Sequence, residues 1–458
     1  MYITNLNPDA DIGATSWLVE VEGHRLLLDA GTHPKREGHA GLPLYAQIRD
    51  QKVDAIAITH CHHDHVGSLP VALRYFPRAE VLMTELSYFL VERVLHNSVN
   101  VMTRQRDELG IREYPLYSHD EVDEIAPLFQ GFKYNRPADW VVPHRPRPGF
   151  LSPTLEFLDA GHVLGAAGIL VRGRQESLFF TGDVSFHDQT LLRRARFEDV
   201  KAEVLILETT RGNRHLPAGF SRAAEVDRLA EAIRRVLARK GSVLIPSFAL
   251  GRTQEILALL AIMMGEGRLK PQPVFIGGLA RVFTEIYDLE AHRTHRQYPN
   301  LELHQALNLI VLDPSQVQKM SLHGGRLFVV TSGMMNENTG AHDLALRLMS
   351  EERHAIFFVG YTNPDTPGGH LRASRPGEPF HFSARAGEAI RQCEVQEFDL
   401  TAHAHRDDLL DFVGAVEPRV VLLSHGEADS RNWFETQIQA RYPRIQVIQP
   451  APGQTVSV

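Results

Sequence analysis

A run of six consecutive residues holds the side chains of this chain that are best suited to metal chemistry. It supplies three imidazoles, from His60, His62 and His65, and the carboxylate of Asp64. Both kinds of group bind zinc, and two zinc ions held close together are a common hydrolytic centre. The run follows an apolar stretch, residues 53–58, that predicts a buried strand. A polar loop that merely contains histidines is the alternative interpretation, and the density of ligands argues against it.

Polar residues also follow three later apolar stretches, each of which predicts a strand. These residues are His162 after 155–160, Asp183 after 177–180, and His425 after 419–423. Strand ends meet at one edge of a sheet, so we expect these side chains to converge with the first cluster. The set then suffices for two zinc ions: His60, His62 and His162 for one, Asp64, His65 and His425 for the other, with Asp183 bridging them. Asp29, at the end of a further predicted strand, is expected to accept a hydrogen bond from a ligand histidine and orient it.

Strands and helices alternate along the rest of the chain, which predicts an α/β fold. Strands at 16–20 and 24–28 are expected to pair about Gly23, and residues 81–95 predict a strand running into a helix. Beyond Asp183 a helix is expected to begin after Ser221 as its N-cap. Further strands and helices are predicted over 205–207, 242–246, 253–264, 273–276, 327–330 and 355–360. This long stretch before His425 predicts an inserted domain.

Composition sets mild limits on the class of protein. The chain has 458 residues, 43% hydrophobic and 23% charged, as in ordinary globular proteins. Its two cysteines, Cys61 and Cys393, cannot form a disulfide framework, and no signal peptide is apparent, so we expect a cytoplasmic location. The longest apolar run, near 256–264, is too short to cross a bilayer, and no membrane partner is expected. A net charge of −8 gives no general attraction for nucleic acid.

The order of the candidate ligands allows a comparison with known folds. Asp29, the His60-x-His62-x-Asp64-His65 run, His162 and Asp183 resemble the pattern of the metallo-β-lactamase fold. That resemblance implies four layers, αββα, with two zinc ions at one edge. The same fold serves lactamases, glyoxalases and thioesterases, so it does not by itself fix the reaction.

Later motifs resemble one branch of that fold, the β-CASP nucleases. They are Glu208 in Glu-Thr-Thr-Arg-Gly, the run Pro-Ser-Phe-Ala-Leu-Gly-Arg-Thr-Gln-Glu at 246–255, His403 in Thr-Ala-His, and His425 in Ser-His-Gly-Glu. They occur in the family's order over essentially the whole chain. The resemblance implies a metallo-β-lactamase domain over residues 1–208 and 392–458, with a β-CASP domain over 209–391 inserted in it.

The resemblance also implies roles for single residues. Two Zn²⁺ ions, with Mn²⁺ as the alternative, would hold a bridging hydroxide that attacks the phosphodiester. The residues implied in catalysis are Asp64, Glu208 and His403. His403, supported by Glu208, would be the general acid. Ser247, Arg252 and Arg281 are candidate phosphate-binding residues, with a helix cap and surface charges as the alternative interpretations. His405 is either a further phosphate donor or acid/base group, or a solvent-facing loop residue.

The nucleic acid is the least determined part of the interpretation. In its final motif the chain has His425, and in this respect it resembles the family members that act on RNA. We therefore expect single-stranded RNA as the partner. Whether the protein forms a homodimer is left open. The alternatives are a DNA end-processing nuclease of the same family, a small-molecule esterase, and a non-catalytic RNA-binding scaffold. An esterase would leave the insertion, Glu208 and His403 unexplained, and a scaffold would be expected to have lost ligands. Residues 363–385, rich in Pro, Gly and Arg, are expected to form an irregular loop on the substrate side.

Overall fold

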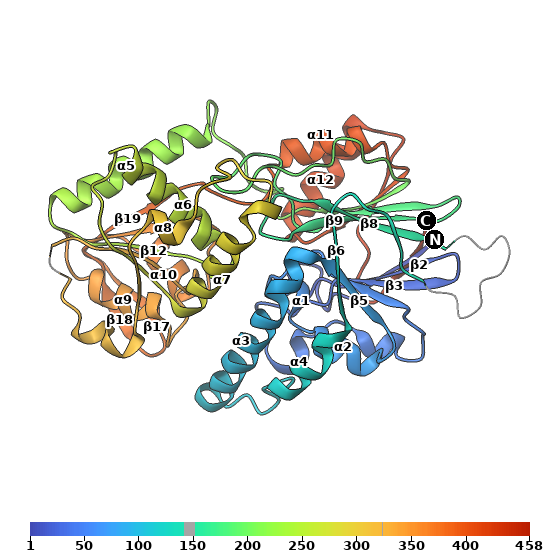
Figure 1. The fold of residues 1–458 in the computed structure, drawn as a ribbon, viewed down its shortest axis with the longest axis horizontal. Coiled ribbons are helices and arrows are strands. Elements are labelled where there is room, and N and C mark those ends of the chain that lie inside the picture. The colour runs from blue at the N-terminus through green and yellow to red at the C-terminus, as the bar shows by residue number, and fades with distance from the viewer. Residues whose placement is uncertain (142–151, 323) are drawn as a thin grey trace. The chain divides into compact units, whose positions relative to one another are not determined.

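Two seven-stranded sheets dominate the first part of the computed structural model, which describes residues 1–141, 152–322 and 324–458 (Figure 1). The first sheet has the order β22 (Thr455–Ser457), β1 (Tyr2–Asn5), β2 (Trp17–Val21), β3 (His24–Leu28), β4 (Ala55–Ala57), β5 (Glu80–Thr84) and β6 (Phe129–Phe132). The predicted pairing of β2 with β3 is present and antiparallel. Glu22 and Gly23 both have positive φ, of 51° and 81°, which is the backbone that a tight two-residue hairpin requires.

The second sheet contains the strands that precede most of the candidate ligands. Its order is β21 (Gln446–Ile448), β20 (Val420–Ser424), β11 (Val204–Glu208), β10 (Ser177–Phe180), β9 (Ala167–Arg172), β8 (Thr154–Asp159) and β7 (Ala138–Asp139). β10, β11 and β20 are parallel, and β8 runs in the same direction because β9 is antiparallel to both of its neighbours. The carboxyl ends of these four strands therefore lie at one edge of the sheet.

Alternation along β11 shows why the central strands β10, β11 and β20 are apolar along most of their length. Val204 and Ile206 face the core between the two sheets, together with Phe157 and Phe180 of the same sheet and Leu28 of the first sheet. Leu205 and Leu207 face the opposite side, where they pack with residues of α11 (Arg406–Val416) and α12 (Ala428–Arg441). A strand buried on both faces has no position for a polar side chain until it ends.

Helices cover the outer faces of both sheets, as Figure 1 shows for α11 and α12 on the second sheet. The first sheet is accompanied by α1 (His63–Val66), α2 (Leu69–Tyr75), α3 (Glu85–Leu109) and α4 (His119–Ile125), and α3 packs against β5 and β6. The arrangement helix, sheet, sheet, helix confirms the predicted αββα sandwich. None of the helices within the described ranges is long and apolar enough to cross a membrane.

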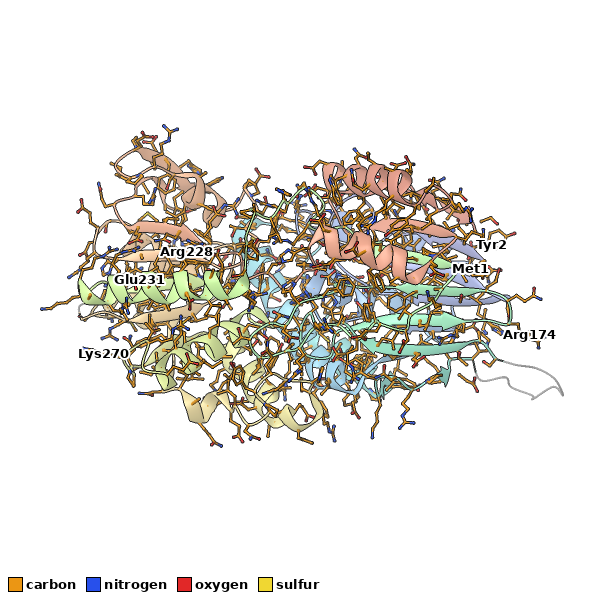
Figure 2. All side chains as sticks on the ribbon, turned by 90° about the horizontal axis from the view of Figure 1, so that it is seen from above. Met1, Tyr2, Arg174, Arg228, Glu231 and Lys270 are labelled. Carbon is orange, nitrogen blue, oxygen red and sulfur yellow. The ribbon has the colours of Figure 1, made fainter. Side chains whose placement is uncertain are left out.

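A third, six-stranded sheet forms the second part of the structure. Its order is β14 (Leu309–Val311), β13 (Val274–Ile276), β15 (Leu327–Val330), β12 (Val243–Pro246), β16 (Ala355–Phe358) and β19 (Glu394–Glu397), and every neighbouring pair is parallel. The helices with it are α5 (Arg222–Ala238), α6 (Arg252–Gly265), α7 (Gly278–Leu289), α8 (Leu303–Ala306) and α9 (Gly340–Leu348). On α5 the charged side chains of Arg228 and Glu231 (Figure 2) leave the buried face to Leu229, Ile233 and Val236.

Ser221 caps α5 as the sequence predicted, since its side chain accepts a hydrogen bond from the Ala224 N–H. The expectation of an irregular loop at 363–385 is wrong. These residues form α10 (Pro367–Ala373), and β17 (Pro379–Ser383) pairs with β18 (Gly387–Ile390) in a hairpin. Thr366 as N-cap and Pro367 as the first helical residue provide a start signal, which explains why a Pro-rich segment can be helical.

The chain divides into two compact units. The first comprises Met1–His187, Arg194–Leu216 and His403–Val458, and the second Asp188–Arg193 and Pro217–Ala402. The predicted boundaries at 208/209 and 391/392 lie somewhat earlier along the chain. Residues just after 208 stay with the first unit because the Asn213 N–H donates to Ser430 Oγ (3.1 Å). Residues after 391 stay with the second unit because β19 completes its sheet.

Candidate metal and catalytic site

The candidate ligands all belong to the first unit and all follow strands. His60 and its neighbours follow β4, His162 follows β8, Asp183 follows β10, and His425 follows β20 directly. His425 has φ of 49°, in the left-handed region that a residue with a side chain seldom adopts. Such strain persists only where the surroundings fix it, and it is frequent at functional sites. The strand ends thus bring together side chains that are up to 365 positions apart in the sequence.

Four side chains form a first group with the geometry of a metal site. Nδ1 of His62 lies 3.1 Å from Nε2 of His60 and 3.2 Å from Nε2 of His162. Oδ2 of Asp183 is 3.7 Å and 3.6 Å from the same two Nε2 atoms. Zinc bonds of about 2.0–2.1 Å place tetrahedral ligand atoms roughly 3.3–3.4 Å apart, so one ion fits among these four atoms.

A second group stands on the other side of Asp183. Nε2 of His425 lies 3.2 Å from Oδ2 of Asp64 and 3.3 Å from Nε2 of His65. Oδ1 of Asp183 is 3.4 Å from the His65 Nε2, so the two oxygens of this carboxylate face different groups. That oxygen is buried and has no hydrogen-bond donor within the described part of the chain. An orphaned carboxylate oxygen among imidazole nitrogens is the arrangement that a bound cation would satisfy.

Charge at the centre follows from burial and from these contacts. Burial alone would raise the pKa of Asp183, but the neighbouring His425, His65 and His403 hold it well below its usual value. Burial, followed by the nearby His65, lowers the pKa of His60 well below its usual value. Asp183 is thus held ionised and His60 neutral, as metal ligands must be. The pKa of His65 is lowered by burial but raised well above its usual value by Asp183 and Asp29, so a metal binding there would have to displace a proton.

Asp29 contacts His65, one of the candidate ligands. Its Oδ2 lies 2.7 Å from His65 Nδ1, and its Oδ1 accepts the Thr59 N–H at 2.7 Å. Because Nδ1 of His65 donates to this carboxylate, the neutral imidazole presents the lone pair of Nε2 to the centre. Gly31 allows the strand end to approach closely, since a Cβ there would lie 1.8 Å from the Asp64 carbonyl oxygen.

His403 and Glu208 form a pair beside the two groups. Nδ1 of His403 is 3.3 Å from each carboxylate oxygen of Glu208, and Nε2 is 3.9 Å from Asp183 Oδ2. Glu208 is buried at the end of β11 and accepts the Val184 N–H at 2.9 Å. Burial lowers the pKa of His403, but the charges of Glu208 and Asp183 outweigh it, and the net direction is upward. The two carboxylates therefore favour the protonated form of this imidazole beside the candidate metal ligands.

Family models match three successive segments of the chain. Residues 10–235 match the Metallo-beta-lactamase superfamily, 253–371 the Beta-Casp domain, and 388–450 the Zn-dependent metallo-hydrolase RNA specificity domain. The chain belongs to the metallo-beta-lactamase superfamily, in its β-CASP branch. The first model includes Asp29, the ligands through Asp183, and Glu208, and the third includes His403 and His425.

Relatives in this β-CASP branch match nearly the whole chain. The chain is 28% identical to the "Probable RNase MJ4" of Methanocaldococcus jannaschii, over 95% of this chain and 96% of the relative. It is 29% identical to "Ribonuclease TTHA0252" of Thermus thermophilus, over 94% of each. It is 24% identical to "Endoribonuclease YSH1" of Eremothecium gossypii, where it covers 95% of itself but spans only 56% of the relative. A crystal structure of a protein of unknown function from Enterococcus faecalis shares the fold, with a TM-score of 0.59, 14% identity and coverage of 99% of each chain.

The candidate phosphate-binding residues Ser247, Arg252 and Arg281 lie in the second unit. Ser247 is buried, and its hydroxyl is directed to the Ile245 carbonyl at 3.4 Å. It does not cap α6, whose N-cap is Gly251. Arg281 is exposed and pairs with Glu285 one turn along α7, at 3.0 Å.

Arg252 begins α6 and is the most enclosed of the three. Burial, followed by the like charge of Arg222, lowers its pKa to about 10. Its Nη1 is buried and has no hydrogen-bond acceptor among the described residues. Glu255, about one turn further along α6, accepts the N–H groups of Thr190, Leu191 and Leu192 at 2.6, 2.8 and 3.0 Å. This part of the motif is therefore structural.

His405 stands at the N-cap of α11, two residues beyond His403. Its ring stacks on His187, with centroids 4.7 Å apart and planes 13° from parallel. His187 and two threonines are residues of this region that sequence reasoning missed. Thr59 Oγ1 donates to Asp29 Oδ2 (2.8 Å), and Thr210 Oγ1 lies 3.0 Å from His425 Nδ1. Both threonines adjoin the motifs directly, which is the only signal that the sequence offered for them.

Proposed function

We propose that this protein is a metal-dependent ribonuclease that hydrolyses phosphodiester bonds in single-stranded RNA. The observation that carries the proposal is the His403–Glu208 pair, whose imidazole Nε2 is 3.9 Å from Asp183 Oδ2. A metal site alone would be compatible with several of the reactions that this superfamily catalyses. A protonated imidazole beside the metal groups is what a poor leaving group, such as the alkoxide of a phosphodiester, requires.

The donor set fits two zinc ions. His60, His62, His162 and Asp183 would hold one, and Asp64, His65 and His425 the other, with Asp183 shared. Zinc at these positions supplies Lewis-acid stabilisation of phosphate charge and lowers the pKa of water. The protein's own contribution is orientation, since Asp29 fixes the tautomer of His65 and Thr210 lies at hydrogen-bond distance from His425.

Proton transfer is assigned to His403. Its Nδ1–H donates to Glu208, which is itself fixed by the N–H of Val184. Nε2 then faces Asp183 and the other candidate metal ligands. In this position it can pass a proton to the oxygen that leaves the cleaved strand. Glu208 is a positioning residue that also keeps the imidazole protonated, because its negative charge favours the imidazolium form.

RNA is the proposed substrate because of the comparisons. The model matching 388–450 is described as an RNA specificity domain, and the relatives that match nearly the whole chain are named as ribonucleases. The third sheet with its helices provides a second unit that a small-molecule esterase would not need. The candidate ligands are all present, which argues against a scaffold that has lost its metals.

The test uses end-labelled single-stranded RNA and DNA of equal length and sequence, with the zinc-loaded protein and its His403→Ala variant. We expect RNA to be cleaved faster than DNA, and His403→Ala to lose about 10²–10⁴-fold of that activity while keeping its zinc. Arg234→Ala serves as a control on an exposed residue of α5. Faster cleavage of DNA would overturn the substrate assignment, and full activity of His403→Ala would remove the proposed general acid.

A further inference from the structure

Glu92, His96 and Asp123 form a second cluster of metal-binding groups, separate from the catalytic residues. Glu92 and His96 are one turn apart on α3, and Asp123 comes from α4. Nε2 of His96 lies 3.1 Å from Asp123 Oδ1 and 3.9 Å from Glu92 Oε1. The three ligand atoms are all within 4.8 Å of one another. The cluster is open to solvent, with Asp123 65% and His96 24% exposed.

A chain of hydrogen bonds determines which nitrogen of His96 carries a proton. Nε2 of His119 lies 3.2 Å from Asn100 Oδ1, and since that oxygen only accepts, His119 must donate from Nε2. The Nδ1 of neutral His119 is then an acceptor. It lies 2.8 Å from Nδ1 of His96, so His96 donates from Nδ1. Nε2 of a neutral His96 is consequently a bare lone pair.

This lone pair faces two carboxylates, an arrangement that is repulsive unless a cation stands between them. Within the described ranges, neither Glu92 nor Asp123 has a lysine or arginine partner. Arg74 of α2 approaches α4 but pairs with Glu121. A proton on His96 or a metal ion among Glu92, His96 and Asp123 would remove this repulsion.

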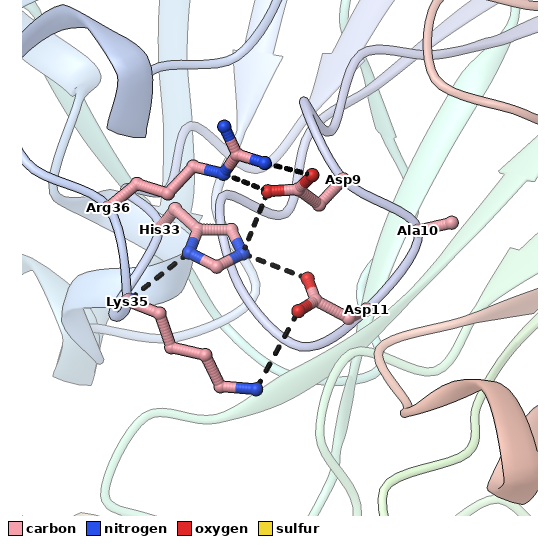
Figure 3. Close-up of a pocket in the computed structure, with 6 residues that line it drawn as sticks. All are labelled: Asp9, Ala10, Asp11, His33, Lys35 and Arg36. Carbon is pink, nitrogen blue, oxygen red and sulfur yellow. Dashed lines mark hydrogen bonds and ion pairs between the residues drawn. The ribbon is translucent and has the colours of Figure 1, made fainter. Parts of the chain in front are cut away.

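A similar trio elsewhere shows how such a cluster is satisfied without a metal. Asp9, Asp11 and His33 line a pocket of about 380 Å³ (Figure 3). There Nδ1 of His33 accepts the Lys35 N–H at 3.1 Å, so Nε2 carries the proton and donates to Asp11 at 2.8 Å. Lys35 and Arg36 neutralise the two carboxylates. The His96 cluster has the opposite tautomer and lacks these cations.

We infer that Glu92, His96 and Asp123 bind a divalent cation of the zinc type, joining α3 to α4. One imidazole and two carboxylates are a ligand set that zinc and manganese accept, with water completing the coordination. His119 and Asn100 position the ligand histidine through its other nitrogen, as the partners of metal-bound histidines commonly do. α4 is itself fixed by a capping box between Ser118 and Glu121, so the bound ion ties together two defined helices.

Calorimetric titration of Zn²⁺ into protein whose catalytic site has already been saturated tests this inference. We expect the wild type to bind one further ion, and the double variant Glu92→Gln/Asp123→Asn to bind it at least about tenfold more weakly. Asp107→Asn, an exposed residue of the same helix, is the matched control and should bind as the wild type does. RNA cleavage should be the same in all three proteins.

Equal uptake of zinc by the wild type and the double variant would show that these carboxylates bind no metal, and would overturn the inference. The relay is tested separately: Asn100→Leu should weaken binding and Asn100→Asp, which keeps an acceptor, should retain it. A rise in Tm on adding zinc that is present in the wild type and absent in the double variant is a second readout. Loss of the further site with intact RNA cleavage would leave the proposed function untouched, so the two proposals fail independently.

Discussion

The carboxylate of Asp29 lies 2.7 Å from Nδ1 of His65, and both side chains are fully buried. Asp29 has φ of 60° and also accepts the N–H and hydroxyl of Thr59, so its position is fixed from several sides. A buried carboxylate held in this way determines the tautomer of the histidine it contacts. Metal affinity at the second group should therefore depend on a residue that contacts no metal.

Asp29→Asn should weaken zinc binding about 10- to 100-fold, because an amide oxygen orients His65 without its negative charge. Competition with a chromogenic chelator measures this affinity. Cys61→Ser is the matched control within the same motif. Its thiol points to the Ser87 carbonyl at 3.4 Å, and burial raises its pKa to about 12, so it takes no part in metal binding. An unchanged affinity in Asp29→Asn would contradict the orienting role.

Asp183→Asn should remove both ions, whereas His425→Ala should remove only one. The two oxygens of Asp183 face different groups, while His425 belongs to the second group alone. Zinc per chain after dialysis, measured by atomic emission, distinguishes the outcomes. We expect about two ions in the wild type, one in His425→Ala and fewer than one in Asp183→Asn. Equal zinc in the two variants would show that the carboxylate is not shared.

Glu255→Gln should destabilise the second unit. The carboxylate of Glu255 is buried and accepts three successive N–H groups, from Thr190 to Leu192. A glutamine retains one acceptor oxygen and brings a donor that faces other donors, at a cost of about 1–3 kcal/mol. Urea unfolding measures the change, with the exposed Glu266→Gln at the other end of α6 as control. Equal midpoints for the two variants would contradict the structural role of this motif residue.

Much of this site could be predicted because its candidate ligands lie one to three residues after the ends of largely apolar strands. His60, Asp183 and His425 follow the apolar runs of β4, β10 and β20, and His162 follows β8. Contacts that depend on tertiary packing could not be predicted. The sequence gives no sign that His187 stacks on His405.

Local composition was also misleading in two places. The short strand β19 is only partly buried and lacks the apolar run that marks β12, β15 and β16 of the same sheet, and the predicted domain boundary fell before it. Segment 363–385 is rich in glycine and proline, yet Gly368 and Gly369 are buried within α10. There a Cβ on Gly369 would lie 2.2 Å from the Asn363 carbonyl oxygen, so glycine serves close packing rather than chain reversal.

Asp159→Asn should change how stability depends on pH. Burial raises the pKa of Asp159 to about 6, against the opposing effects of the Gly161 N–H and Arg196. The folded state thus binds this proton more tightly than the unfolded chain does. The contribution of Asp159 to stability is complete below the unfolded pKa of about 3.9, and it is lost as pH rises through about 6.

Asparagine keeps the acceptor for Gly161 and does not titrate. Between pH 4 and pH 7 the variant should therefore gain about 1–3 kcal/mol of stability relative to the wild type. Urea unfolding of both proteins at several pH values in this range gives the difference, in which effects common to both proteins cancel. A constant difference across the range would show that Asp159 does not titrate differently in the folded state.

Glu208→Gln should shift the pH dependence of cleavage on its alkaline side. As a general acid, His403 must be protonated, so cleavage falls as pH rises through its pKa. Although burial lowers that pKa, the charges of Glu208 and Asp183 raise it overall. Replacing Glu208 by glutamine removes one of these charges while leaving an acceptor for Nδ1. The alkaline limb of kcat/KM should then move to lower pH, with a smaller loss of rate on the acidic side.

Glu198→Gln, a change at an exposed residue of the same unit, is the control and should leave the pH profile of cleavage unchanged. A Glu208→Gln enzyme that loses rate equally at every pH would show that Glu208 positions His403 without setting its protonation.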